Sequence, residues 1–129
     1  MSKKKILAVD DDEGILETLR MLLESKGFEV TTISHGTKAL ELFKTKGNRP
    51  DLILLDVMMP EIDGYKICRI LKYNDEHKHI PIIMLTGMSH SKNKLLGFAS
   101  EADDYVTKPF DHDHLLQKIN KLLELEVKK

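Results

Sequence analysis

The stretch DLILLDVMMPEIDG, residues 51–64, contains the pattern from which the fold is predicted. Its apolar run at residues 52–55 is followed at once by Asp56, and a proline and a glycine come soon after. A short run that is apolar at every position is typical of a strand buried on both faces of a parallel sheet. We therefore predict a strand over residues 52–55 with a carboxylate at its carboxyl end.

Working outward, apolar runs alternate with segments that have helical spacing. Further strands are expected at residues 6–9, 28–33, 80–85 and 105–106, and helices around residues 15–23, 39–43, 67–71, 95–98 and 115–123. Gly27 and Gly47 stand where two of these helices would end, and Asp63 and Asp111 are candidate N-caps. The third helix is expected to bury Ile67, Ile70 and Leu71.

Strict alternation of strands and helices predicts an α/β fold, with a parallel sheet covered by helices on both faces. Five units are too few for an eightfold barrel, which leaves an open, doubly wound sheet. The length of 129 residues fits a single domain, 1–129, with its core over about 4–125. The alternation alone gives no strand order.

Composition excludes several classes of protein. The formal net charge is -1, so no overall positive field favours direct binding of nucleic acid or of an acidic membrane surface. The apolar run near the N-terminus is too short for a signal peptide or a membrane span. The one cysteine, Cys68, allows no internal disulfide, and a reduced, cytoplasmic protein is expected.

Polar groups with chemical potential follow four of the expected strands. They are Asp10, Asp11 and Asp12 after the first strand, Asp56 after the third, Thr86 and Gly87 after the fourth, and Thr107 and Lys108 after the fifth. Sites in open α/β sheets form beyond the carboxyl ends of the strands, so we expect these groups to converge.

Such a cluster of carboxylates favours a bound cation. Two carboxylates about 5 Å apart repel by roughly 3 kcal/mol at an effective dielectric constant near 20. A hard divalent cation with oxygen ligands, Mg²⁺ above all, relieves this repulsion, and Lys108 offsets part of the remaining charge. Because a carboxylate can attack phosphorus, the set is sufficient for accepting a phosphoryl group.

Each of these residues also has a purely structural interpretation. Asp11 and Asp12 could cap the first helix, Asp56 could be a turn residue, and Lys108 could be an exposed loop lysine. The structural interpretation is reasonable for each residue alone, but the location of all of them at the ends of four expected strands favours a functional site.

At this point the chain resembles the receiver domains of two-component response regulators, the family of the chemotaxis regulator. The resemblance spans about residues 4–125, and its blocks stand in the family's order and spacing: Ile6–Glu13, Asp51–Gly64, Pro81–Gly87 and Ala102–Phe110. It implies a flavodoxin-like sheet with strand order 2-1-3-4-5.

The resemblance also implies a role for each matching position around the metal. Asp56 matches the phosphoacceptor. Asp10 and Asp11 match the acidic pair that binds Mg²⁺ (or Mn²⁺) together with Asp56, and Asp11 is expected to be the more direct ligand of the two. Met58 matches the position that lends a backbone carbonyl to the metal.

A second group of matching positions concerns the phosphoryl group. Thr86 and the neighbouring Gly87 match the switch position, Tyr105 matches the aromatic residue that moves inward, and Lys108 matches the lysine that pairs with the phosphate. The Lys108–Pro109 peptide bond is expected to be cis.

The implied function is that of a signalling switch, not an enzyme. A sensor histidine kinase or a phosphotransfer protein donates the phosphoryl group to Asp56. The face formed by the fourth helix, fifth strand and fifth helix then changes shape, engaging a downstream effector or a second copy of the chain. Met58 and Met88 lie two residues after Asp56 and Thr86, where apolar side chains cannot orient the attacking water, so self-dephosphorylation is expected to be slow.

Two rivals fit less well. The first rival, an aspartyl-phosphate phosphatase of haloacid-dehalogenase type, requires a second Asp two residues after the nucleophile, where this chain has Met58. The second rival, a flavin- or nucleotide-binding module, requires a Gly-rich or Ser/Thr-rich loop after the first strand, where this chain has three aspartates. One departure from the family pattern stands out, namely Glu101, which takes a position where relatives usually have Gly. We expect a stand-alone regulator slightly more than a receiver cut from a longer protein.

Overall fold

A computed structural model describes residues 3–45, 47, 49–87 and 102–124 of the chain. The fourth helix expected near residues 95–98 lies outside the described residues, as do Met88 and Glu101. The elements are β1 (Lys5–Val9), α1 (Glu13–Ser25), β2 (Glu29–Ile33), α2 (Gly36–Leu42), β3 (Leu52–Asp56), α3 (Gly64–Lys72), β4 (Ile82–Gly87), β5 (Asp104–Lys108) and α5 (His112–Leu123).

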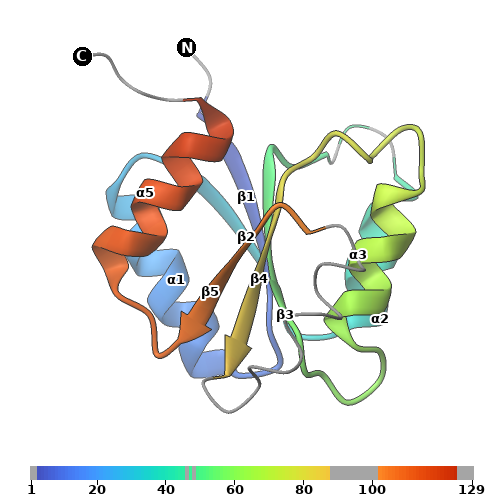
Figure 1. The fold of residues 1–129 in the computed structure, drawn as a ribbon, viewed down its shortest axis with the longest axis horizontal. Helices are drawn as coiled ribbons and strands as arrows, with labels where there is room; N and C mark the ends of the chain where they lie inside the picture. Colours follow the sequence, from blue (N-terminus) through green and yellow to red (C-terminus); the bar gives the residue numbers. More distant parts are fainter. Residues whose placement is uncertain (1–2, 46, 48, 88–101, 125–129) are drawn as a thin grey trace.

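The five strands form one parallel sheet in the order β2-β1-β3-β4-β5. This confirms both the parallel sheet predicted from the alternation and the strand order implied by the resemblance. Helices α1 and α5 lie on one face of the sheet, and α2 and α3 lie on the other (Figure 1). The fold is therefore the doubly wound α/β sheet that the sequence predicts.

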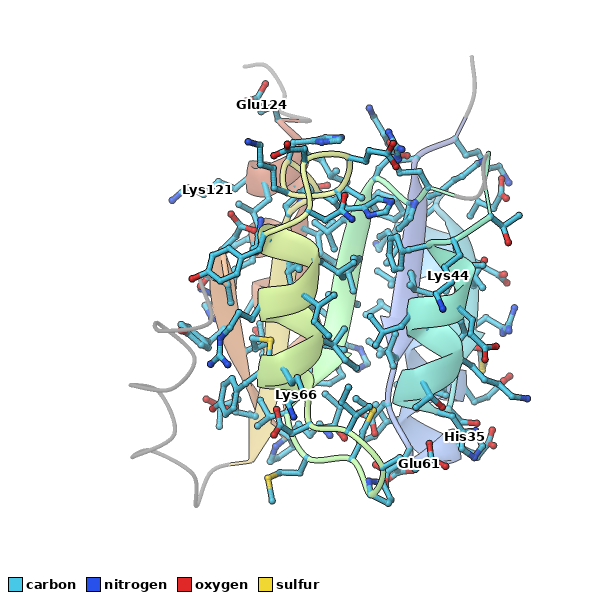
Figure 2. All side chains as sticks on the ribbon, turned by 90° about the vertical axis from the view of Figure 1, so that its right-hand side faces the viewer. His35, Lys44, Glu61, Lys66, Lys121 and Glu124 are labelled. Atoms are coloured by element: carbon cyan, nitrogen blue, oxygen red, sulfur yellow. The ribbon has the colours of Figure 1, made fainter. Side chains whose placement is uncertain are left out.

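The core consists of two apolar layers separated by the sheet. Along β3, Leu52 and Leu54 pack with the residues of α1 and α5, whereas Ile53 and Leu55 pack with those of α2 and α3. Side chains of a strand alternate between faces, so a strand covered on both sides must be apolar throughout. Figure 2 shows side chains filling the space between the sheet and the helices.

Aspartates define the starts of three helices. The side chain of Asp12 accepts hydrogen bonds from the backbone N–H groups of Gly14 and Ile15 and so caps α1. Asp63 caps α3 and Asp111 caps α5, as predicted. The helix-capping interpretation, offered for Asp11 and Asp12, is therefore correct for Asp12 and leaves Asp10 and Asp11 for the site.

Two sequence expectations need correction. Three strands run further than their apolar runs, because the ladder continues through Asp56, Thr86, Gly87 and Lys108. Ile70, expected in the core stripe of α3, is 46% exposed. Helix α3 buries Ile67 and Leu71 as expected, together with Cys68, and Ile70 lies to the side of that stripe.

No helix among the described parts of the chain has the length and the apolar character needed to span a membrane.

Candidate functional site

The groups predicted to converge are placed at the carboxyl edge of the sheet. Asp56 is the last residue of β3 and aligns with Leu85 in the ladder to β4. Thr86 and Lys108 lie at the ends of β4 and β5, whose arrowheads point to the same end of the molecule (Figure 1). Because three of these groups are ladder residues, hydrogen bonds of the sheet hold them and no loop conformation has to position them.

Three carboxylates form the centre of the site. One oxygen atom from each of Asp10, Asp11 and Asp56 lies within 4.8 Å of the others. Asp10 is fully buried, Asp56 is 4% exposed, and Asp11 is exposed. Two buried anions and one that faces solvent form a cluster that is open on one side.

Lys108 is the cation that faces this cluster. Its Nζ lies 2.8 Å from Asp10 Oδ2 and donates a hydrogen bond of 3.0 Å to Asp56 Oδ1. Burial by itself would lower the pKa of Lys108, but the contacts with Asp10 and Asp56 outweigh it and raise that pKa. The lysine is therefore charged at neutral pH and balances one of the two buried carboxylates. Its peptide bond to Pro109 is cis.

The second buried negative charge is left without full compensation at Asp56. Burial, followed by the negative charge of Asp10, raises the pKa of the Asp56 carboxyl from 3.8 to about 7, against the opposing effect of Lys108. A carboxyl group with such a pKa is held in its charged form only at a cost, which a further cation would remove. The donor set, three carboxylates with an open side, fits a hard divalent cation such as Mg²⁺.

Backbone N–H groups orient two of the carboxylates. Asp10 Oδ1 accepts a hydrogen bond of 2.9 Å from the N–H of Asp12, so the residue that caps α1 also turns Asp10 toward Lys108. Met58 donates its N–H to Asp56 Oδ1 at 3.4 Å. The side chain of Met58 is 55% exposed, so the residue contributes its backbone to the site and presents its thioether to solvent.

Gly64 is a site residue that the sequence analysis missed. Its N–H donates a hydrogen bond of 2.8 Å to the carbonyl of Val57, folding the β3–α3 loop back onto the end of β3. A Cβ atom at this position would collide with the backbone carbonyl of Asp56. The available signal was a glycine directly after the N-cap Asp63, where glycine is otherwise a poor helix former.

Thr86 and Tyr105 are the remaining predicted residues. Thr86 is 3% exposed and pairs with Thr107 across the β4–β5 ladder, and Gly87 follows it at the strand end. Tyr105 is half-buried and aligns with Met84. Burial raises the pKa of the Tyr105 hydroxyl to about 12, so the side chain stays a neutral phenol at every physiological pH.

Two cavities are lined in part by residues of the candidate site or their neighbours. One of about 370 Å³ is lined by Asp11, Glu13, His35, Pro60 and Glu61, among others. His35 and Glu61 lie at the same end of the molecule in Figure 2. A more apolar cavity of about 620 Å³ is lined by Asp12, Ile15, Lys108 and Phe110, among others. The exposed carboxylate of the cluster, Asp11, and the cation Lys108 thus each line a cavity.

Sequence comparison identifies a family. The family model "Response regulator receiver domain" matches residues 6–120. The DNA-binding dual master transcriptional regulator RpaA of Synechocystis sp. is 39% identical over 119 residues, which are 92% of this chain and 48% of that protein. The chain spans about half the length of the curated relatives it matches.

Structure comparison agrees with this family. The chemotaxis response regulator CheY4 of Vibrio cholerae superimposes with a TM-score of 0.85 at 31% identity, covering 94% of this chain and 99% of that one. The receiver domain of the sensor histidine kinase PA1611 from Pseudomonas aeruginosa has a TM-score of 0.86 at 26% identity and covers 95% and 99%. That structure is described with a magnesium ion coordinated in the active site cleft.

Proposed function

Because the chain belongs to the response regulator receiver family, we propose that it is a signalling switch in which Asp56 accepts a phosphoryl group from a partner protein. The observation that carries the proposal is the setting of Asp56. This carboxylate is buried, hydrogen-bonded to Lys108, and within 4.8 Å of two other carboxylates. Few structural roles would justify gathering so much like charge at the edge of a sheet.

Asp10, Asp11, Asp56 and the backbone carbonyl of Met58 are the groups that would hold Mg²⁺ or Mn²⁺. When bound, the cation neutralises carboxylate charge and that of the phosphoryl oxygens. The magnesium described in the Pseudomonas receiver supports this assignment. The raised pKa of Asp56 supports it from the side of this chain, since the carboxylate lacks a sufficient counter-charge.

In the transfer step, a carboxylate oxygen of Asp56 attacks the phosphorus of a phosphohistidine. The new O–P bond forms as the P–N bond breaks, and the imidazole leaves with the bonding electron pair and takes a proton from solvent. Lys108 already lies 3.0 Å from Asp56 Oδ1, so a small shift would pair its ammonium with a phosphoryl oxygen. Such pre-positioned charge is the main contribution that a protein makes to phosphoryl transfer.

The switch follows from the new charge. A phosphoryl group on Asp56 would add negative charge near the end of the adjacent strand β4. The Thr86 hydroxyl and the backbone of Gly87, which lie at that strand end, are the groups that would bind it. Tyr105 lies on the next strand and can occupy the space that Thr86 leaves. The face that includes β5 and α5 then changes shape, which is a local charge event acting on a two-state element.

Met58 distinguishes this switch from an enzyme that turns over phosphate esters. A phosphatase of haloacid-dehalogenase type needs an acid two residues after its nucleophile, and here a thioether that is 55% exposed stands there. An apolar side chain can neither donate a proton nor hold a water firmly, so the phosphorylated state is expected to decay slowly. The proposed module thus accepts a phosphoryl group from small donors, loses it slowly, and catalyses no turnover of phosphate esters.

The partners follow from the family. The phosphodonor is a sensor histidine kinase or a phosphotransfer protein, and the phosphorylated face binds a downstream effector, an attached output domain or a second copy of the chain. DNA binding is a property named for the RpaA relative, which is about twice as long. The single cysteine of the sequence, Cys68, is fully buried, which fits a reduced, cytoplasmic setting.

The decisive experiment is incubation with Mg²⁺ and a small phosphodonor such as acetyl phosphate, followed by intact-mass spectrometry. We expect a gain of one phosphoryl group in the wild type and none in Asp56→Ala. Asp51→Asn is the matched control, because Asp51 lies before the same strand and should leave phosphorylation unchanged. A wild type that gains no phosphoryl group from any donor, or an Asp56→Ala variant that does, would contradict the proposal.

A further inference from the structure

Two methionines among the described residues present their sulfur-bearing side chains to solvent. Met21 on α1 is 65% exposed and Met58 in the β3–α3 loop is 55% exposed, whereas Met59 is 9% exposed and Met84 is fully buried. Susceptibility to oxidation follows exposure, so Met21 and Met58 are the described methionines open to a dissolved oxidant. They differ in location, because only Met58 lies at the functional site.

Met58 is held against Asp56 through its own backbone. Its N–H donates to Asp56 Oδ1 at 3.4 Å, and the residues on either side, Val57 and Met59, are buried. The main chain is therefore anchored where the side chain begins. A chemical change of this thioether alters a group that the fold keeps within two residues of the phosphoacceptor.

We propose that Met58 is a peroxide-sensitive modification site, and that its oxidation to the sulfoxide shortens the lifetime of phosphorylated Asp56. In the step, the thioether sulfur attacks one oxygen of hydrogen peroxide, the O–O bond breaks, and the products are the sulfoxide and water. Sulfur is oxidised by two electrons and the peroxide is reduced by two. A methionine sulfoxide reductase reverses the change.

The effect on lifetime follows from the polarity of the two forms. A thioether is a weak hydrogen-bond acceptor, and it leaves water near Asp56 without a fixed partner. The sulfoxide oxygen is a strong acceptor on the same flexible side chain and can hold a water beside the phosphoryl group. One added hydrogen bond to that water accelerates hydrolysis on the order of three- to tenfold.

This inference rests on the proposed function, and the experiment separates the two. The full chain is oxidised with limiting hydrogen peroxide, mapped by peptide mass spectrometry, and phosphorylated with acetyl phosphate and Mg²⁺. The decay of the phosphoryl group is then followed by intact mass. We expect a roughly three- to tenfold shorter half-life when Met58 carries one added oxygen, restored by sulfoxide reductase.

Variants assign the effect to one side chain. Met58→Leu should lose the response to peroxide although it retains every other methionine and Cys68, whereas Met21→Leu, which removes the other exposed thioether, should keep it. Met58→Gln places a permanent amide acceptor at the position and should shorten the half-life of the phosphoryl group without peroxide. Because this variant needs no oxidant, it tests the inference even if peroxide unfolds the chain.

Three results would overturn the inference while leaving the proposed function in place. They are an unchanged half-life with Met58 fully oxidised, oxidation of Met21 that spares Met58, and a Met58→Gln variant that decays no faster than Met58→Leu. A chain that never gains a phosphoryl group, oxidised or not, would overturn the proposed function itself and this inference with it.

Discussion

Asp56 is a carboxyl group whose negative charge is disfavoured by burial and by Asp10 and favoured by Lys108. The chain places it at the buried end of β3, beside the negative charge of Asp10, and supplies one ammonium group for the two. A pKa raised to about 7 is the consequence. The free protein therefore contains a destabilised carboxylate that protonation or a bound cation would relieve, and stability measurements can detect it.

The first prediction concerns this carboxylate without a metal. Between pH 3.8 and about 7 the folded chain holds a proton on Asp56 that the unfolded chain has released. The contribution of Asp56 to stability is thus fully present below pH 3.8 and is lost as the pH rises through about 7. Asp56→Asn should raise the free energy of unfolding by on the order of 2 kcal/mol at pH 8 in EDTA, with a much smaller gain at pH 4.5.

Urea denaturation followed by circular dichroism tests this prediction at the two pH values. Asp75→Asn is the control, because its carboxylate is 94% exposed and should change stability at neither pH. Adding Mg²⁺ should stabilise the wild type more than Asp56→Asn, since a ligand that binds the folded state adds to its stability. An Asp56→Asn variant no more stable than the wild type at pH 8 in EDTA would show that the carboxylate is not strained.

Gly64 is the second residue whose role can be measured. Gly64→Ala puts a Cβ against the backbone carbonyl of Asp56, and neither group is a flexible side chain that could move aside. We expect a loss of about 2–4 kcal/mol in the free energy of unfolding, together with weaker Mg²⁺ binding, because the end of β3 must shift.

Gly14→Ala provides the comparison for this change. A Cβ at Gly14 would meet only the side chain of Asp12, at 3.3 Å, and alanine is the better helix former. The expected change in stability is therefore close to zero or slightly favourable, measured by the same denaturation. Equal effects of the two substitutions would remove the argument that Gly64 protects the position of Asp56.

At the scale of elements, the amino end of β5 is attached from both faces of the sheet. Lys72, at the end of α3, donates to Asp103 Oδ2 at 2.7 Å and to the backbone carbonyl of Ile80 at 3.0 Å, and Lys118 of α5 donates to Asp104 at 2.8 Å. Asp103 also accepts from the N–H of Ile82 at the start of β4. These contacts fix the strand that carries Tyr105 and Lys108 at the end opposite to the site.

The third prediction compares two ion pairs of similar composition. The Lys72 side chain is 9% exposed and satisfies backbone carbonyls as well as Asp103. Lys72→Met should therefore cost about 1–3 kcal/mol, and a double-mutant cycle with Asp103→Asn should show coupling. Lys78 pairs with Asp75 at the surface, where the two side chains are 60% and 94% exposed, so Lys78→Met should change stability by no more than about 0.5 kcal/mol. Equal costs for the two lysines would contradict this difference.

At the scale of the whole molecule, two buried groups at opposite ends of the sheet give opposite dependences on pH. His77 precedes β4, is 6% exposed, and packs edge-on against Phe43. Burial, followed by the positive charge of Arg49, lowers the pKa of His77 below 6.5, although Glu76 opposes this. The contribution of Asp56 to the free energy of unfolding therefore rises as the pH falls, whereas that of His77 rises as the pH rises.

The fourth prediction isolates the histidine. Below pH 6.5 the unfolded chain binds a proton on His77 that the folded chain takes up only at lower pH, so stability falls as the pH falls. In the Asp56→Asn background the opposing contribution of Asp56 is removed, so the free energy of unfolding should fall as the pH falls from 7 to 5. Adding His77→Phe should flatten this dependence. Chemical denaturation across that range provides the measurement. A slope that persists after His77→Phe would assign it to other groups.

The sequence by itself determined the fold class and pointed to most residues of the candidate site. Apolar runs such as residues 52–55, alternating with helical stripes, are sufficient for a parallel sheet because hydrophobic periodicity is local information. The N-caps Asp63 and Asp111 were predictable for the same reason, since capping involves residues three positions apart. The strand order came from the four family blocks and was confirmed by the sheet. Asp10, Asp11, Asp56, Thr86 and Lys108 were identified because each stands one or two residues after an apolar run.

Only the tertiary structure decided how these residues share charge and space. The structure shows that Lys108 contacts both Asp10 and Asp56, that Gly64 must lack a side chain, that Ile70 faces solvent, and that Lys72 reaches Asp103. Each of these facts depends on the relative position of segments that lie far apart in the chain or on the angle at which a helix meets the sheet. Such positions are set by the packing of two complete apolar layers, which no local pattern records. The raised pKa of Asp56 belongs to the same class, because burial and the Asp10 charge act on it only after the sheet has formed.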